Sequence, residues 1–138
     1  IDPFTPLSAF AREALEVRLA DALALVPQAR QEGNAEAQHR LRIALKHFRY
    51  RMEILSFLLG PGYPELHAAI KRYQDVLGKM HDLDVFAGIV REAAFAPPAA
   101  ELVQNAIAAR RDELFAAFTA MLATLPVEGI GERVRDAL

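Results

Sequence analysis

Hydrophobic residues recur every three or four positions along most of the chain, a spacing that places them on one side of an α-helix. This pattern predicts a first helix over about residues 6–27 and a second over about residues 35–59. Asn34 is a favoured N-cap for the second helix. The sequence Gly60-Pro61-Gly62 then predicts its end, because glycine and proline stop helices.

The same spacing continues in the second half of the chain. It predicts a third helix from about Pro64 to Phe95 and a fourth over about residues 97–125, and residues 127–138 form a tail with room for one short helix. No alternating strand pattern occurs. Long amphipathic helices joined by short turns predict an all-α fold, specifically an antiparallel up-and-down four-helix bundle over residues 6–126.

Composition limits the class of protein. The chain has 138 residues, 53% of them hydrophobic, which is enough for one domain with a proper core. It has no cysteine, so neither a disulfide framework nor a thiolate site is expected. No apolar run approaches the roughly 18 residues of a membrane span, and no signal segment opens the chain. We therefore expect a soluble, cytoplasmic protein, with residues 1–5 as an expression-tag remnant.

Positive charge is concentrated in the stretch His39–Arg51. This stretch holds five of the 16 Lys and Arg residues and no acid, although the chain has a net charge of -2. Four basic side chains share one sector of the predicted second helix, opposite its apolar row: His39, Arg42, Lys46 and Arg49. Neighbouring like charges on a helix cost on the order of 0.2 to 0.5 kcal/mol per pair. The repulsion indicates a surface that binds an anion.

A matching polar stripe lies on the predicted third helix: Lys71, Gln74, Gly78, His81 and Asp82. The second and third helices are expected to be antiparallel neighbours, so equal rise per residue places Arg42 near His81 and Asp82, and Lys46 beside Gly78. Asp82 would then hold Arg42 or a neighbouring cation by a charge-assisted hydrogen bond, or else be an ordinary surface carboxylate. Asp84 falls on the apolar row and needs hydrogen-bond donors if it is buried.

The sequence offers little for catalysis. Ser8 and Ser56 are the only serines, no histidine shares their helical register, and no glycine-rich phosphate loop is present. The stretch His81-Asp82-Leu83-Asp84 matches no strong metal-ligand spacing. We therefore expect no enzyme activity, no cofactor and no metal site.

Together the two stripes resemble the CHAD domain, the conserved histidine α-helical domain. The family's His, Arg, Lys, Arg-Tyr and Glu series is matched here by His39, Arg42, Lys46, Arg49-Tyr50 and Glu53. Its Gln-Asp-x-Leu-Gly-x-x-x-Asp-hydrophobic-Asp series is matched by residues 74–84. The resemblance covers roughly residues 35–92.

The resemblance implies non-catalytic binding of inorganic polyphosphate or a similar polyanion. By this resemblance, six residues contact phosphate: His39, Arg42, Lys46, Arg49, Lys71 and His81. Three residues orient them: Tyr50, Gln74 and Asp82. A complete CHAD domain has two four-helix units around a basic channel, whereas this chain has one. We therefore expect a two-fold homodimer that buries the apolar flank of the stripe, formed by Ile43, Tyr50 and Ile54.

Three other functions stay open. A histidine phosphotransfer module would use His39, although that family usually has Lys and Gly where Arg42 and Ile43 stand here. Nucleic-acid binding is a second, and overall acidity and the lack of exposed aromatic residues for stacking weigh against it. A structural dimerisation module whose basic face binds nothing is the third.

Overall fold

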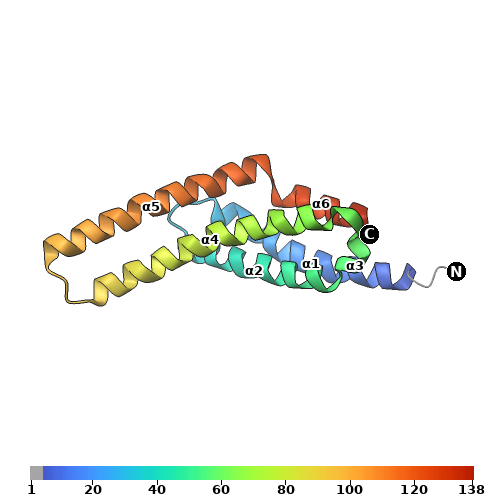
Figure 1. The fold of residues 1–138 in the computed structure, drawn as a ribbon, viewed down its shortest axis with the longest axis horizontal. Coiled ribbons are helices and arrows are strands. Elements are labelled where there is room, and N and C mark those ends of the chain that lie inside the picture. Colours follow the sequence, from blue (N-terminus) through green and yellow to red (C-terminus); the bar gives the residue numbers. More distant parts are fainter. Residues whose placement is uncertain (1–4) are drawn as a thin grey trace.

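The computed structural model describes residues 5–138 and is helical almost throughout (Figure 1). No strand occurs in this part of the chain, so the expected all-α fold is confirmed. Residues 1–4, most of the expected tag remnant, lie outside the described residues. The elements are α1 (Thr5–Ala29), α2 (Ala35–Ile54), α3 (Ser56–Leu59), a 3-10 turn η1 (Gly60–Gly62), α4 (Tyr63–Glu92), α5 (Pro97–Thr124) and α6 (Val127–Ala137).

The long helices run back and forth, and each packs on the next: α1 on α2, α2 on α4, and α4 on α5. The short helix α6 then returns to pack against α1, α3 and α4. This is a succession of helical hairpins, and it does not confirm the expected antiparallel up-and-down four-helix bundle. The far half of the α4–α5 hairpin extends beyond the end of α1 and α2 (Figure 1).

The core draws large side chains from α1, α2, α4, α5 and α6. Its largest fully buried members are Tyr73, Phe48 and Phe118. The Tyr73 and Phe118 rings meet edge to face with centroids 6.2 Å apart. The Tyr73 hydroxyl donates to the Leu125 carbonyl, and burial raises the pKa of this tyrosine to about 12. The Tyr73 side chain therefore links α4 to the end of α5.

The connection between α2 and α4 differs from the prediction. The helix expected over residues 35–59 breaks at Leu55, whose backbone has φ -96° and ψ 12°. The chain continues through α3 and η1, with Gly60 at φ 70°, a conformation that favours glycine. Elsewhere the predicted boundaries agree with the structure to within a few residues. Pro27 lies in the last turn of α1, which ends at Ala29.

The C-terminal segment is a structural element of the core. α6 buries one face, consisting of Val127, Ile130, Gly131 and Val134. A Cβ at Gly131 would overlap the buried Leu19 side chain, so glycine permits this close approach of α6 to α1. The tail expected after residue 126 thus completes the core on the side of α1.

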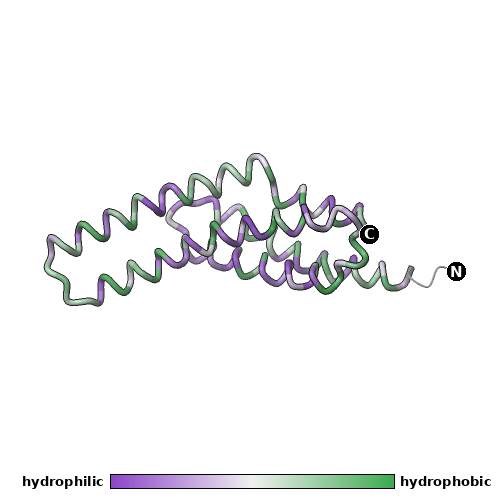
Figure 2. Tube along the Cα trace, in the orientation of Figure 1, coloured by the Kyte–Doolittle hydropathy of each residue, from purple (hydrophilic) through white to green (hydrophobic). Residues whose placement is uncertain are grey.

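Apolar side chains remain exposed at the far end of the α4–α5 hairpin, which Figure 2 colours largely as hydrophobic. Five large ones are between 46% and 72% exposed: Val85, Phe86, Ile89, Phe95 and Leu102. No single helix within residues 5–138 is both long and apolar enough to cross a membrane. Only α5 and α6 taken together, with a 45° bend between them, meet the criteria of length and composition.

Candidate functional site

The N-cap and the buried apolar row together fix how α2 is oriented about its own axis. The Asn34 side chain accepts a hydrogen bond from the Ala37 amide at 3.1 Å, and the row Leu41, Leu45, Phe48 and Met52 is completely buried. Each basic residue of the stripe follows a buried residue and is turned by about 100° from it. The stripe therefore lies half-buried along the junction of α2 with α4, and not opposite the core as the sequence predicted.

Three contacts define how α2 and α4 face each other. The His39 and His81 rings stack with centroids 3.9 Å apart. Arg42 Nε lies 3.4 Å from the place a Cβ would take at Gly78. His67 Nε2 lies 2.8 Å from Glu53 Oε1. In each pair, the two residues are equally far from Gly60 along the chain.

This register corrects the predicted one by about one helical turn. Gly78 leaves space for Arg42, and not for Lys46, while His81 meets His39 instead of Arg42. The reason is that α2 ends at Ile54, so the chain reverses earlier than a helix to residue 59 would allow. The same register places Lys46 across from Gln74, and Arg49 across from Lys71.

We call the resulting surface the basic face. It consists of His39, Arg42, Lys46 and Arg49 on α2 and Lys71, Gln74, Gly78 and His81 on α4. Arg42 and Lys46 form no ion pair with any described residue. Glu53 lies at one end, where its Oε1 is 3.4 Å from Arg49 Nε. Positive charge is thus left unbalanced in the middle of the face.

Two predicted orienting residues have different surroundings. The Tyr50 ring lies 5.7 Å from Lys46 Nζ and 5.2 Å from the Arg49 guanidinium carbon, measured to the ring centroid. Such contacts are attractive and restrict where the two cations point. Asp82 is exposed and makes no hydrogen bond or ion pair with Arg42, so the predicted bond between them is absent.

The basic face also holds buried polar atoms without a partner. Within residues 5–138, four buried side-chain nitrogen or oxygen atoms lack a hydrogen bond, and three of them are His39 Nδ1, Arg49 Nε and Gln74 Oε1. Leaving such an atom unsatisfied costs about 1–3 kcal/mol. The face therefore has unused hydrogen-bonding capacity as well as unbalanced charge.

The electrostatics at the His39 end favour a neutral imidazole in the free protein. Burial lowers the pKa of His39 below its ordinary value of 6.5, and the neighbouring His81 and Arg42 lower it further. A charged ring would lose hydration and be repelled by both neighbours. His39 is therefore mainly neutral at pH 7.

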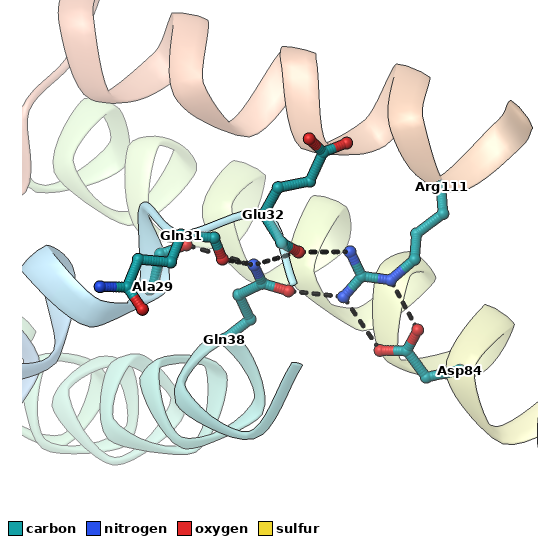
Figure 3. A network of polar contacts seen from close by, with 6 residues as sticks. All are labelled: Ala29, Gln31, Glu32, Gln38, Asp84 and Arg111. Atoms are coloured by element: carbon teal, nitrogen blue, oxygen red, sulfur yellow. Dashed lines mark hydrogen bonds and ion pairs between the residues drawn. The ribbon is translucent and has the colours of Figure 1, made fainter. Parts of the chain in front are cut away.

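Asp84 has a partner that the sequence did not identify. Arg111 of α5 binds it with two hydrogen bonds, from Nε to Oδ1 at 2.6 Å and from Nη2 to Oδ2 at 3.0 Å (Figure 3). Arg111 Nη2 also donates to Gln38, which is 2% exposed. Gln38 in turn donates to the Ala29 and Gln31 carbonyls at 3.2 and 2.9 Å. This network joins α5, α4 and α2 beside the His39 end of the basic face.

The sequence had indicated that Asp84 needs a partner, but not which residue provides it. Asp84 on an apolar row required a donor, but nothing local marked Arg111, which is 27 positions further along the chain. The carboxylate therefore acts in folding and is not available as a ligand. In the described part of the chain, no group of three or more His, Cys, Asp or Glu side chains could hold a metal ion.

The family model of the CHAD domain matches residues 2–91. The chain belongs to the CHAD domain family. The match includes α2 and nearly all of α4, and therefore both sides of the basic face, whereas α5 and α6 lie beyond it. No curated protein and no solved structure matches the chain.

Proposed function

We propose that this CHAD domain binds inorganic polyphosphate, or a similar phosphate-rich polyanion, through the basic face and without catalysis. The observation that carries the proposal is the position of Arg42 and Lys46 on successive turns of α2, half-buried and without a carboxylate partner. Membership of the CHAD family supports it, because this family is associated with polyphosphate binding.

A linear polyanion suits the shape of the basic face. Its cations follow the axis of α2 in a line, with His39 and His81 at one end and Arg49 and Lys71 at the other. Charge-assisted hydrogen bonds contribute about 1.5–3 kcal/mol each before ordering costs. Arg42 offers a planar fork of donors and Lys46 a compact charge, which suits several phosphates better than one. Gln74 and Tyr50 would orient these groups, whereas no described contact supports such a role for Asp82.

The geometry is less suited to phosphotransfer through His39. That reaction needs a histidine that a second protein domain can reach, but the His39 ring is covered by His81 and its Nδ1 is buried. Nucleic acids present the same phosphate chemistry, so competition between long-chain polyphosphate and duplex DNA for the basic face separates these two ligands.

We further propose that a second copy of the chain covers the basic face in a two-fold homodimer. Exposed apolar groups flank the face on α2 and lie beyond its His81 end on α4. On α2, Ile43, Tyr50 and Ile54 are 37%, 42% and 74% exposed. On α4, Val85 and Ile89 are 48% and 56% exposed, and their spacing from Gly78 returns them to the side of the basic face. In a two-fold pair, the Ile54 end of one copy would meet the Val85 end of the other.

The binding proposal is tested by titrating long-chain polyphosphate into wild type, Arg42→Ala/Lys46→Ala and the control Arg12→Ala/Arg72→Ala. Both pairs remove two positive charges, and the control arginines are exposed and form no ion pair with described residues. Losing two charge-assisted contacts is expected to weaken binding on the order of a hundredfold or more. The control should bind like wild type, and circular dichroism should show unchanged helicity. Equal weakening of both variants would reject the proposed site.

A further inference from the structure

The stacked pair His39 and His81 is unusual because both rings are titratable and lie between two helices. Their centroids are 3.9 Å apart and their planes differ by only 12°. One nitrogen of the pair, His39 Nδ1, is buried without a hydrogen bond to any described residue. The pair also belongs to the basic face, next to Arg42.

The charged groups flanking the pair come from three helices: Glu36, Arg40 and Arg42 of α2, Asp82 and Asp84 of α4, and Arg111 of α5. Two of the three carboxylates are already paired, Glu36 with Arg40 at 2.8 Å and Asp84 with Arg111 at 2.6 Å. The third, Asp82, is exposed to solvent. Arg42 has no carboxylate partner among the described residues, and its charge adds to burial and to His81 in lowering the pKa of His39.

Two imidazolium rings at this separation repel each other strongly. Protonation of one ring therefore opposes protonation of the other. Burial and the charge of Arg42 act in the same direction, and the lowered pKa of His39 agrees with this.

We infer that His39 and His81 form a proton-linked anion subsite, in which a bound phosphate group draws protons onto the pair. This inference rests on the proposed function. An anion next to the rings offsets their mutual repulsion and favours the charged form of each. Ligand binding is then accompanied by proton uptake, and affinity for the polyanion rises as the pH falls from 8 to 6.

Falling pH should raise the affinity for the polyanion, but through His39 it should lower the stability of the ligand-free domain. Because the folded-state pKa of His39 lies below 6.5, its contribution to stability is complete above that pH. It is lost as the pH falls from 6.5 through the folded-state pKa. The ligand-free domain should thus lose stability over the same range in which the polyanion binds more tightly.

The test measures the affinity of long-chain polyphosphate by calorimetry between pH 5.5 and 8.5, in buffers of differing ionisation enthalpy. Long chains keep the titration of terminal phosphates small. Wild type should take up about one proton and gain up to about tenfold in affinity per pH unit within the responsive range. His39→Gln and His81→Gln should flatten this dependence, whereas His47→Gln, an exposed histidine outside the basic face, should retain it.

Two experiments can overturn the inference. The first is the affinity measurement, if the pH dependence persists in both His39→Gln and His81→Gln or is absent from wild type. The second is an NMR titration of the ligand-free protein, if both imidazoles titrate independently near pH 6.5. Binding at pH 8, where His39 is neutral, tests the proposed function separately, through Arg42→Ala/Lys46→Ala. If that binding is real, either result rejects the proton linkage alone; if polyphosphate binds at no pH, both proposals fail.

Discussion

At the scale of single residues, the small size of Gly78 leaves room for Arg42 to lie against α4. Glycine in a helix costs about 0.8–1 kcal/mol relative to alanine. A Cβ at Gly78 would be 3.4 Å from Arg42 Nε, which is an ordinary contact distance, so a methyl group fits beside the guanidinium. A longer side chain would occupy the place of the guanidinium itself.

Substitutions at Gly78 should therefore separate stability from binding. Gly78→Ala is expected to raise the free energy of unfolding by up to about 1 kcal/mol, measured by urea denaturation, with polyphosphate affinity kept. Gly78→Leu should displace Arg42 and weaken binding.

The matched control is Gly88, which is on the same helix, where a Cβ would be 3.6 Å from Arg91. Gly88→Leu should leave affinity unchanged. Equal effects of leucine at both positions would show that Gly78 has no part in the site.

Residue-level patterns predicted that the basic residues of α2 share one sector of the helix, because helical spacing is local. The sector shared by His39, Arg42 and Lys46 depends only on about 100° of rotation per residue. Which residue each one meets on α4 depends on the connection between the helices. The sequence could not predict that register, because Ser56–Leu59 is apolar enough to continue α2, and the break at Leu55 has no local marker.

At the scale of elements, the Arg111 network fixes α5 against the rest of the fold. The side chains of Arg111 and Asp84 are 15% and 30% exposed. Removing the guanidinium would leave Asp84 without its two donors and Gln38 without the donor to its amide oxygen. Arg111→Ala should lower the free energy of unfolding by about 1–3 kcal/mol.

The neighbouring residue provides the control. Arg110 pairs with Glu113 at 2.9 Å, but their side chains are 53% and 68% exposed. Solvent screens such a pair, so Arg110→Ala should change stability by less than about 0.5 kcal/mol. Equal losses for the two variants in thermal denaturation would mean that the network does not hold α5.

The predicted elements agree with the structure where caps and prolines mark them locally. Asn34, Pro64 and Pro97 all lie near observed helix starts. The packing of α6 could not be predicted in this way. Gly131 meets Leu19 from the opposite end of the chain, and no short-range pattern connects the two.

At the scale of the whole molecule, the exposed apolar groups beside the basic face predict self-association. Light scattering at tens of micromolar should give twice the chain mass of 15.3 kDa. Ile54→Glu should return it to a single chain, because the substitution places a charge where the partner is proposed to bind. Ile54 is 74% exposed, so the fold itself should be unaffected.

Two results would contradict the dimer. One is a monomeric mass for wild type over this concentration range. The other is an unchanged dimer mass in Ile54→Glu, which would place the partner on another surface.

The central claim, that cations of the basic face neutralise a bound polyanion, is tested most directly by salt dependence. Polyphosphate affinity is measured at pH 8 from low to high salt, in wild type and Arg42→Ala/Lys46→Ala. Wild type should show a steep fall of log affinity with log salt concentration. The variant should bind more weakly with a shallower slope, by about 0.7 per lost contact if the ligand behaves like a single-stranded nucleic acid. Identical slopes and affinities in the two proteins would contradict the account.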